Sequence, residues 1–242
     1  MSGTLYIVPT PVGNLSDMTP RAVETLQSVS LVLAEDTRTS RPLMQHFGIT
    51  TPLASHHKFN EHQTVAPIVA KLLSGQDIAL ISDAGTPGIS DPGFMLSREC
   101  RTAGVRVVTL PGATAFVPAL VDSGLPCDRF TFIGFLPPKK GRAELLGAIA
   151  QSPVTTIVYE SPLRVLRTLA QLAEVCGADR QASVSREISK QYETTVRGTL
   201  DEIILNFEAN TPRGEIVIIV GPRPQEKHRE HRNKYRDEST NI

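Results

Sequence analysis

Short apolar runs alternate with amphipathic stretches along the first half of the chain. The runs are rich in β-branched residues and end at polar or turn-forming residues, a pattern typical of strands. The stretches between them carry helix boundaries, such as Thr19 before Pro20 at a helix start and Gly75 or Gly104 after a helix end. We predict strands at residues 4–9, 31–35, 52–56, 77–82 and 105–110. Strands that alternate with helices over short connections predict a parallel sheet covered on both faces.

The second half repeats this alternation less regularly. We predict strands at residues 130–135, 155–160, 182–187 and 215–220, and one more at 192–198. The strand at 192–198 is expected to pair antiparallel, which would make the second sheet mixed. Gly, Pro and charged residues cluster at residues 122–129, where we place the boundary between two α/β domains.

Three further helix signals fix the expected ends of individual helices. Thr199 with Glu202, and Asn60 with Gln63, have the spacing of a capping box. Ser161 and Pro162 predict the start of a helix that ends at Gly177. The predicted organisation is therefore an N-terminal domain at 1–122, a C-terminal domain at 123–221 and a tail at 222–242.

The tail has almost no apolar residues and carries six Lys or Arg against four acids. This composition predicts a disordered segment. A basic tail is most often a solvated extension, and an arm that contacts RNA is the alternative.

Composition narrows the class of protein. The chain has 242 residues, 40% of them hydrophobic, and its 25 basic residues balance 25 acidic ones. Its start lacks the pattern of a signal peptide, and no apolar run is long enough to span a membrane. The three cysteines form no CxxC pair, and we expect reduced thiols in a cytoplasmic protein. A zero net charge means that any phosphate binding requires a local group of Lys and Arg.

Three loops rich in Gly and Pro follow predicted strands of the first sheet: "PTPVGNL" at 9–15, "SDAGTPGISDPG" at 82–93 and "LPGATA" at 110–115. In an open parallel sheet, ligands bind beyond the carboxyl ends of the strands, and small residues let a ligand approach the backbone. Any one of these loops is more simply an ordinary connection, but three at one edge predict a binding site. None has the spacing of a dinucleotide-binding or P-loop motif.

These loops also carry a family resemblance, together with "AEDTR" (34–38), "GFLPPKKGR" (134–142), "YESP" (159–162), "REISKQYE" (186–193) and "GEIVIIV" (214–220). The chain resembles the tetrapyrrole-methylase superfamily and, within it, the ribosomal RNA small-subunit methyltransferase I family. The resemblance implies a homodimeric enzyme that binds S-adenosylmethionine between two α/β domains and makes 2′-O-methylcytidine in small-subunit ribosomal RNA. The chain departs from the family pattern at Leu163, where His is usual, and at Arg213, where Lys is usual.

The resemblance turns the three loops into a predicted cofactor site. Tyr159 ends a strand that faces the cleft, with a place in the core as the alternative interpretation. The residues expected to bind S-adenosylmethionine are Pro11, Gly13, Ser82, Asp83, Ala84, Gly85, Thr86, Pro111, Gly112, Thr114, Ala115 and Tyr159. No metal site is predicted, because the His residues at 56–62 lack partners at a ligand spacing.

Charged residues near the predicted cleft are candidates for catalysis. Lys190 is expected to stabilise an alkoxide or, if buried, to act as a base, with Glu187 or Glu193 orienting it. Asp36 and Arg38 are expected to position the ribose or a phosphate. For each of these residues the alternative is an exposed charge in a surface turn or ion pair, which contributes little to stability.

The RNA contacts are expected from Lys139, Lys140 and Arg142 in the Pro- and Gly-rich loop, and from His56. A solvated loop is the alternative. Two other functions stay open: methylation of a tetrapyrrole or corrin precursor with the same fold and cofactor, and a non-catalytic ribosome-assembly factor that binds RNA.

Overall fold

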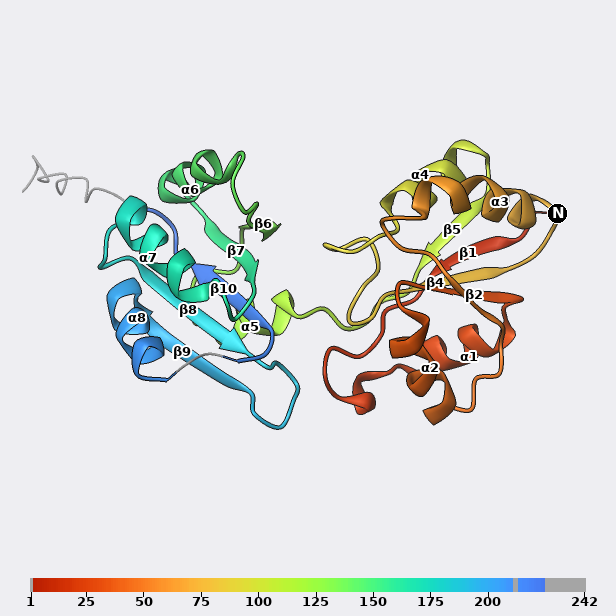
Figure 1. Cartoon of the computed structure of the whole chain (residues 1–242), viewed down its shortest axis with the longest axis horizontal. Coiled ribbons are helices and arrows are strands. Elements are labelled where there is room, and N and C mark those ends of the chain that lie inside the picture. The colour runs from red at the N-terminus through yellow and green to blue at the C-terminus, as the bar shows by residue number, and fades with distance from the viewer. Residues whose placement is uncertain (1, 211–212, 225–242) are drawn as a thin grey trace, which may run out of the picture.

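A computed structural model describes residues 2–210 and 213–224. The chain forms two lobes, each built on a five-stranded sheet (Figure 1). The predicted disordered tail lies, from residue 225 on, outside the described residues.

The first lobe contains an all-parallel sheet in the order β3-β2-β4-β1-β5, as predicted. Its strands are β1 (Thr4–Ile7), β2 (Leu31–Ala34), β3 (Leu53–Ser55), β4 (Ile78–Ile81) and β5 (Arg106–Thr109). Its helices are the short 3-10 helix η1 (Leu15–Asp17), α1 (Pro20–Ser28), α2 (Thr37–His46), α3 (Glu61–Leu73) and α4 (Phe94–Thr102). One apolar cluster packs under α1 and α2 and another under α3 and α4, so both faces of the sheet are covered (Figure 1).

The second lobe contains a mixed sheet in the order β6-β7-β10-β8-β9, with only β6 and β7 parallel. Its strands are β6 (Phe130–Phe135), β7 (Thr155–Glu160), β8 (Gln181–Arg186), β9 (Thr194–Thr199) and β10 (Ile216–Val220). Its helices are α5 (Phe116–Asp122), α6 (Arg142–Gln151), α7 (Val165–Cys176) and α8 (Leu200–Ala209). The predicted antiparallel strand near 192–198 is confirmed as β9.

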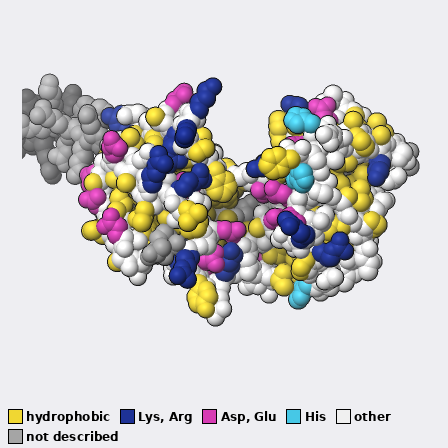
Figure 2. All heavy atoms as spheres, viewed as in Figure 1, with side chains coloured by type: hydrophobic (Ala, Val, Ile, Leu, Met, Phe, Trp, Pro, Cys, Tyr) yellow, Lys and Arg dark blue, Asp and Glu magenta, His cyan; other side chains and the backbone are white. Residues whose placement is uncertain are grey.

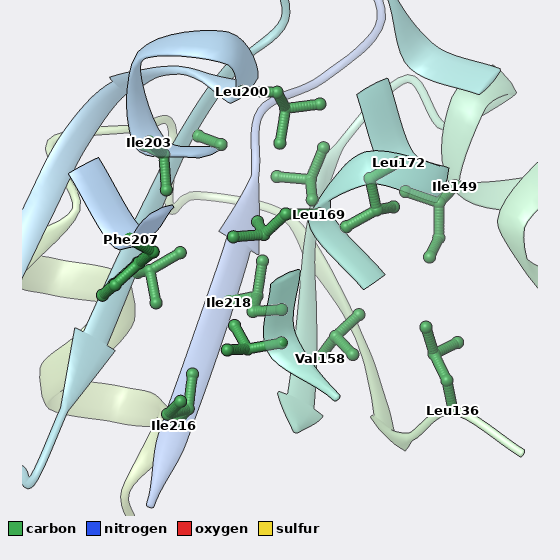
Figure 3. Close-up of a cluster of buried hydrophobic side chains, with 14 of the residues drawn as sticks. Leu136, Ile149, Val158, Leu169, Leu172, Leu200, Ile203, Phe207, Ile216 and Ile218 are labelled. Atoms are coloured by element: carbon green, nitrogen blue, oxygen red, sulfur yellow. The ribbon is translucent and has the colours of Figure 1, made fainter. Parts of the chain in front are cut away.

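The core of the second lobe lies between α6, α7, α8 and the sheet. β10 is buried along its whole length, because it is the central strand and both its faces are covered. Figure 3 shows Leu169 and Leu172 of α7, and Phe207 of α8, directed at Ile218 of β10 and its neighbours. The continuous apolar run of this strand is the sequence signature of that double coverage.

Helix α5 packs on the second sheet, not on the first. Its Ala119 and Leu120 are buried against Ile157, Val217 and Ile219, and Asp122 accepts a hydrogen bond from Arg197 of β9 at 2.7 Å. The chain therefore crosses between lobes at residues 110–115, ahead of the predicted boundary at 122. The Gly, Pro and charged residues at 122–129 follow the end of α5 within the second lobe.

Two predicted caps, at Thr19 and Thr199, are confirmed; Asn60 precedes α3 as predicted but forms no capping box, and the predicted start of a helix at Ser161 is wrong. Thr19 accepts a hydrogen bond from the amide of Ala22 at 3.1 Å, and Thr199 forms a complete capping box with Glu202. Asn60 instead accepts from the amide of His57 at 2.8 Å, so its side chain closes the preceding turn. Helix α7 begins at Val165, after a turn that starts at Ser161.

No helix in residues 2–210 and 213–224 combines the length and the apolar character that crossing a bilayer requires.

Candidate active site

Hydrogen bonds hold the three glycine-rich loops together at the carboxyl edge of the first sheet. Thr10 and Gly85 exchange backbone hydrogen bonds of 2.9 and 3.0 Å, which joins the loop after β1 to the loop after β4. Thr86 Oγ1 donates to the carbonyl of Ala113 at 3.0 Å, which adds the loop after β5. Gly85 has a φ of +80°, which favours glycine at this junction. Its amide is occupied by Thr10 and is therefore not free to bind a ligand.

The strand order explains why a cavity opens here. β1 and β4 are neighbours, yet the chain leaves β1 towards β2 and leaves β4 towards β5, on opposite sides of the pair. At such a switch point the chain continues from the two strands to opposite faces of the sheet, with α1 on one face and α4 on the other, and a crevice lies beyond the strand ends. The second lobe covers the crevice, and Figure 2 shows the surface hollowed between the lobes.

The resulting cavity has a volume of about 390 Å³ and is lined by both lobes. That volume is within the range of small-molecule and cofactor sites. From the first lobe come Val12, Glu35, Asp83, Ala84, Gly85, Thr86, Ile89, Ser90 and Asp91, and from the linker Thr114 and Ala115. From the second lobe come Phe135, Tyr159, Glu160, Ser161, Pro162, Ile188, Gly214, Glu215, Ile216 and Val217.

The structure brings seven of the predicted cofactor residues to this cavity: Asp83, Ala84, Gly85, Thr86, Thr114, Ala115 and Tyr159. Pro11, Gly13 and Ser82 line a neighbouring hollow, which shares Asp83 with the cavity. Pro111 and Gly112 line neither. Gly112 packs against Pro9 so closely that a Cβ would lie 2.6 Å from the Pro9 ring.

Three carboxyl groups, Glu35, Asp83 and Asp91, make one wall of the cavity acidic. Burial and the charge of Asp83 raise the pKa of Glu35, and burial raises the pKa of Asp83. Burial, followed by the charge of Glu35, raises the pKa of Asp91 to about 7. The mutual repulsion of these groups without a ligand favours a cationic ligand, whose charge would offset it.

Asp36 and Arg38 form a local ion pair at the start of α2. Asp36 caps the helix by accepting from the amide of Arg38 at 2.8 Å, and it also binds the guanidinium at 2.6 Å. These hydrogen bonds from Arg38 lower the pKa of Asp36 to about 2. The amide of Asp36 donates to Asp83 at 3.2 Å, which fixes that carboxylate in the cavity wall. The Arg38 side chain is 90% exposed and is free to contact a large substrate.

Lys190 is held as a cation beside the cavity. Its Nζ lies 2.9 Å from Glu187 Oε1 and 3.1 Å from Glu215 Oε2, and Glu215 lines the cavity. Partial burial lowers the pKa of Lys190, but the hydrogen bonds to Glu187 and Glu215 outweigh it and raise the pKa overall. A raised pKa favours the protonated form and so disfavours the predicted role as a base, which stays a prediction. The role as a fixed positive charge stays a prediction.

Lys190 also takes part in the contact between the lobes. A Cβ at Gly13 would overlap the Lys190 side chain and lie 2.9 Å from the carbonyl of Ile188. Ser189 Oγ donates to Asp17 Oδ2 at 2.6 Å across the same contact. A glycine is therefore required where the first loop passes under the turn that carries Lys190.

Two of the predicted RNA contacts are wrong because their side chains are buried. His56 is fully buried, with its Nδ1 2.8 Å from Thr64 Oγ1. Arg142 is also buried and donates to Thr168 at 2.7 Å, to Gln171 at 2.9 Å and to the carbonyl of Pro137 at 3.3 Å. Neither side chain can reach a phosphate group.

Lys139 and Lys140 are exposed in the same loop, as a phosphate contact requires. Arg142 anchors that loop to α7, and its Nη1 lies 3.9 Å from the buried carboxylate of Glu160, which lines the cavity. Figure 2 shows basic side chains gathered on the second lobe and acidic ones on both sides of the cleft.

Sequence reasoning did not select Asp91, Ser90 or Glu215 as site residues, although all three line the cavity. One signal was available: the second Asp-Pro-Gly at 91–93 lies in the same loop as Asp83. Ser90 has a φ of +67°, uncommon for a residue other than glycine, and this strain is visible only in the structure.

Comparisons with known proteins agree with this fold. Residues 4–204 match the family model of the tetrapyrrole (corrin/porphyrin) methylases. The chain therefore belongs to this class of two-lobed α/β proteins. Solved structures share the fold. A cobalt precorrin-4 methyltransferase has a TM-score of 0.68 at 17% identity, and the match covers 90% of this chain and 94% of that one. A diphthine synthase has a TM-score of 0.72 at 12% identity, covering 90% of each chain.

Sequence relatives narrow the family. The ribosomal RNA small subunit methyltransferase I of a Synechocystis species is 50% identical over 99% of this chain and 87% of its own length. The protein of the same name from Pseudomonas aeruginosa is 49% identical over 90% of this chain and 79% of its own length. The chain belongs to the ribosomal RNA small subunit methyltransferase I family of the tetrapyrrole methylases. It is therefore a methyltransferase that depends on S-adenosylmethionine.

The residues of the cavity fit this methyl donor. S-adenosylmethionine carries a sulfonium and an ammonium group, which the carboxylates of Glu35, Asp83 and Asp91 complement in charge. Its adenosine is an apolar body with polar edges, and the opposite wall offers Tyr159, Ile188 and Val217. The loop at 84–86 allows a close approach because its side chains are small.

Proposed function

We propose that the chain transfers a methyl group from S-adenosylmethionine to the ribose 2′-hydroxyl of a cytidine in small-subunit ribosomal RNA. The observation that carries the proposal is 50% identity over 99% of this chain to a ribosomal RNA small subunit methyltransferase I. The choice of cytidine and of the 2′-oxygen rests on the resemblance of the motifs to that family.

The cavity contributes mainly by positioning. The bound donor supplies a methyl group activated by a positively charged sulfur. Asp83, fixed by the amide of Asp36, and Glu35 hold the cationic part of the donor in one place. Holding two reactants in line converts a bimolecular reaction into an effectively unimolecular one, which supplies a large share of the rate enhancement.

In this proposal Lys190 stabilises the ribose oxygen as that oxygen loses its proton to solvent water. The oxygen–methyl bond forms as the methyl–sulfur bond breaks, and the donor leaves as a neutral thioether. A ribose hydroxyl is a weak nucleophile, and a fixed positive charge lowers the free energy of the oxygen as negative charge develops on it. Glu187 and Glu215 hold Nζ within 3.1 Å and keep it protonated, so the charge is present at neutral pH. Glu187 is a positioning residue in this scheme.

RNA is bound outside the cavity by exposed cations. Lys139 and Lys140 contact phosphates from the second lobe, and Arg38 contacts the ribose or a phosphate from the first. These three side chains give local positive charge to a chain whose net charge is zero.

In this proposal the enzyme acts as a homodimer in the cytoplasm. Val117 and Val121 of α5 and Phe130 of the edge strand β6 are large exposed apolar residues on one lobe, which supports a self-association surface. Light scattering of the purified chain, and of a Val121→Glu variant, tests the dimer. The free thiols Cys100, Cys127 and Cys176 fit a reducing compartment.

Mass mapping of small-subunit ribosomal RNA tests the main proposal. RNA from cells that lack this protein should miss one ribose methyl group, and restoring the gene should return it on a cytidine. A complete set of ribose methyl groups in those cells would contradict the proposal. Purified protein that methylates a tetrapyrrole precursor instead would move it to the other branch of the superfamily.

A further inference from the structure

An exposed aromatic ring lies on the turn between β3 and α3. Phe59 is 82% exposed, although burying a phenyl ring is normally favourable. Lys58 Nζ lies 4.9 Å from the centre of the ring, and His57 packs edge-on against it at 6.0 Å. The turn therefore presents an aromatic face together with a cation.

Hydrogen bonds keep this turn in one conformation. Asn60 Oδ1 accepts from the amide of His57 at 2.8 Å, and Asn60 Nδ2 donates to the carbonyl of Ser55 at 3.2 Å. The amide of Phe59 donates to Nδ1 of His57 at 3.2 Å. The buried His56 anchors the base of the turn through Thr64. A ring held in place loses little conformational entropy when it binds a partner.

The turn lies beside the cavity. β2 and β3 are parallel neighbours with Ala34 paired to Ser55, so Glu35 and His56 leave the sheet at the same edge. The charges of Lys58 and His57 act on the Glu35 carboxylate in the cavity wall, after burial and Asp83. Glu61 accepts from the amide of Gly93 at 3.4 Å, which joins the turn to the loop that carries Asp91.

We infer that Phe59 stacks on a base of the RNA strand next to the target nucleotide, while Lys58 contacts a neighbouring phosphate. The inference rests on the proposed function, since it needs RNA at this cavity. Sequence-tolerant stacking on an exposed aromatic is a general way of holding single-stranded RNA, because every base has a π face. A nucleotide drawn into a cavity leaves its neighbours unstacked, and an aromatic ring at the entrance compensates for the lost stacking.

The surroundings of Phe59 favour a base over an apolar protein partner. Its neighbours in the turn are the exposed Lys58 and the partly buried His57 and Asn60. A single ring among polar groups is not the contiguous apolar patch that a protein interface requires. The adjacent cation complements the phosphate that accompanies each base.

Three substitutions at one position test the inference: Phe59→Ala, Phe59→Leu and Phe59→Tyr. The matched control is Leu73→Ala, because Leu73 is also an exposed apolar residue of the first lobe. It lies at the other end of α3, about 18 Å away along the helix axis. The substrate is small ribosomal subunits, and free RNA extracted from them, isolated from cells that lack the enzyme. Binding of S-adenosylmethionine is measured separately by calorimetry.

We expect Phe59→Ala to raise the Kd for both RNA substrates at least about fivefold, with the Kd for S-adenosylmethionine unchanged. Phe59→Tyr should restore binding, whereas Phe59→Leu should not, because leucine keeps apolar area without a π face. Leu73→Ala should bind as the unsubstituted enzyme does.

Three results would overturn the inference. Equal RNA affinity for Phe59→Ala and the unsubstituted enzyme would show that no base stacks there. Full rescue by leucine would replace stacking with simple apolar contact. A loss on assembled subunits alone would assign Phe59 to a ribosomal protein. Methylation of small-subunit RNA by the unsubstituted enzyme separates these results from a failure of the proposed function. If the unsubstituted enzyme methylates that RNA, only the inference about Phe59 fails. If it does not, the proposed function fails.

Discussion

The two lobes have sheets of the same size but contribute different parts of the site. The first has an all-parallel sheet, whose loops all leave at one edge and bring Gly85, Thr86 and Ala113 into contact. The second has a mixed sheet, in which only part of the loops reach that edge, among them the turn with Lys190. The first lobe thus supplies backbone and the acidic wall of Glu35, Asp83 and Asp91. The second lobe supplies Lys190, the exposed Lys139 and Lys140, two further carboxylates at Glu160 and Glu215, and a cover.

This difference follows from the charges of the two substrates. The methyl donor is cationic where it reacts and suits the acidic wall of Glu35, Asp83 and Asp91. RNA is anionic and suits Lys139, Lys140 and Lys190. A cleft between two lobes lets opposite potentials face each other at short range, which a single loop cluster does not permit.

The largest effect is expected from removing Arg142, a buried cation of the second lobe. Arg142→Ala removes buried hydrogen bonds to Thr168, Gln171 and the Pro137 carbonyl, which should lower the free energy of unfolding by about 3 kcal/mol. Glu160 keeps its hydrogen bond from Thr168 and its ion pair with Arg164. Denaturant unfolding measures this loss. The control Arg129→Ala breaks an exposed pair with Asp128 and should cost less than about 1 kcal/mol. Equal costs for the two variants would mean that the loop is not anchored by Arg142.

The second effect concerns the cation at the cleft. Lys190→Ala should lower the methylation rate at saturating RNA about a hundredfold, because a fixed charge that stabilises the reacting oxygen is lost. Single-turnover kinetics with labelled donor measure the rate, and RNA affinity should change much less. Lys190→Arg should restore part of the rate. A parallel loss of rate and RNA affinity would make Lys190 an RNA-binding residue only.

The third effect tests the acidic wall through pH. Asp91 has a pKa of about 7, so it is neutral below that pH and ionised above it. Affinity for the cationic donor should therefore rise as the pH increases from 6 to 8, by about tenfold at most. Without the donor, the same carboxyl lowers the free energy of unfolding as the pH rises from about 4 to about 7, because the unfolded chain releases this proton first.

Asp91→Asn is the matched variant for that experiment, since it keeps the shape of the side chain and removes its titration. Calorimetry should give a donor affinity that is flat over this pH range. A slope that persists in Asp91→Asn would assign the titration to Glu35 or Asp83, whose pKa values are also raised.

The smallest effect is expected at the exposed loop of the second lobe. Lys139→Ala combined with Lys140→Ala should reduce the salt dependence of RNA binding by about one to two phosphate contacts. The measurement is the slope of the logarithm of the binding constant against the logarithm of salt concentration. Activity with saturating RNA should be unchanged, and an unaltered slope would exclude the loop from the RNA interface.

Much of the fold was predictable because the signals are local. The ends of nine predicted strands lie within two residues of the observed ends. The tenth, predicted at 192–198, is β9, whose observed start is two residues later. The assignment of α5 was not predictable in this way. Its apolar residues fit against either sheet, and only packing on Ile157 and Val217 decides that it belongs to the second lobe.

The site was predictable as a set of loops and less so as a set of side chains. Asp83, Gly85 and Thr86 lie in a loop whose composition alone marks it. His56 and Arg142 have the residue types of an RNA contact, and both are buried instead. Residue type does not reveal which of several neighbouring polar groups faces water, because that depends on elements far away in the chain.

The amino-acid sequence by itself determined the two α/β halves, the three glycine-rich loops and the family, since periodicity, turn residues and motifs are properties of short stretches. The tertiary structure alone decided that Asp91 and Glu215 share one cavity, that Lys190 is paired with Glu187 and Glu215, and that Phe59 rather than His56 is exposed beside the cavity. The physical reason is that burial and electrostatic environment arise from residues distant in sequence, which become neighbours only when the two lobes close over the edge of the first sheet.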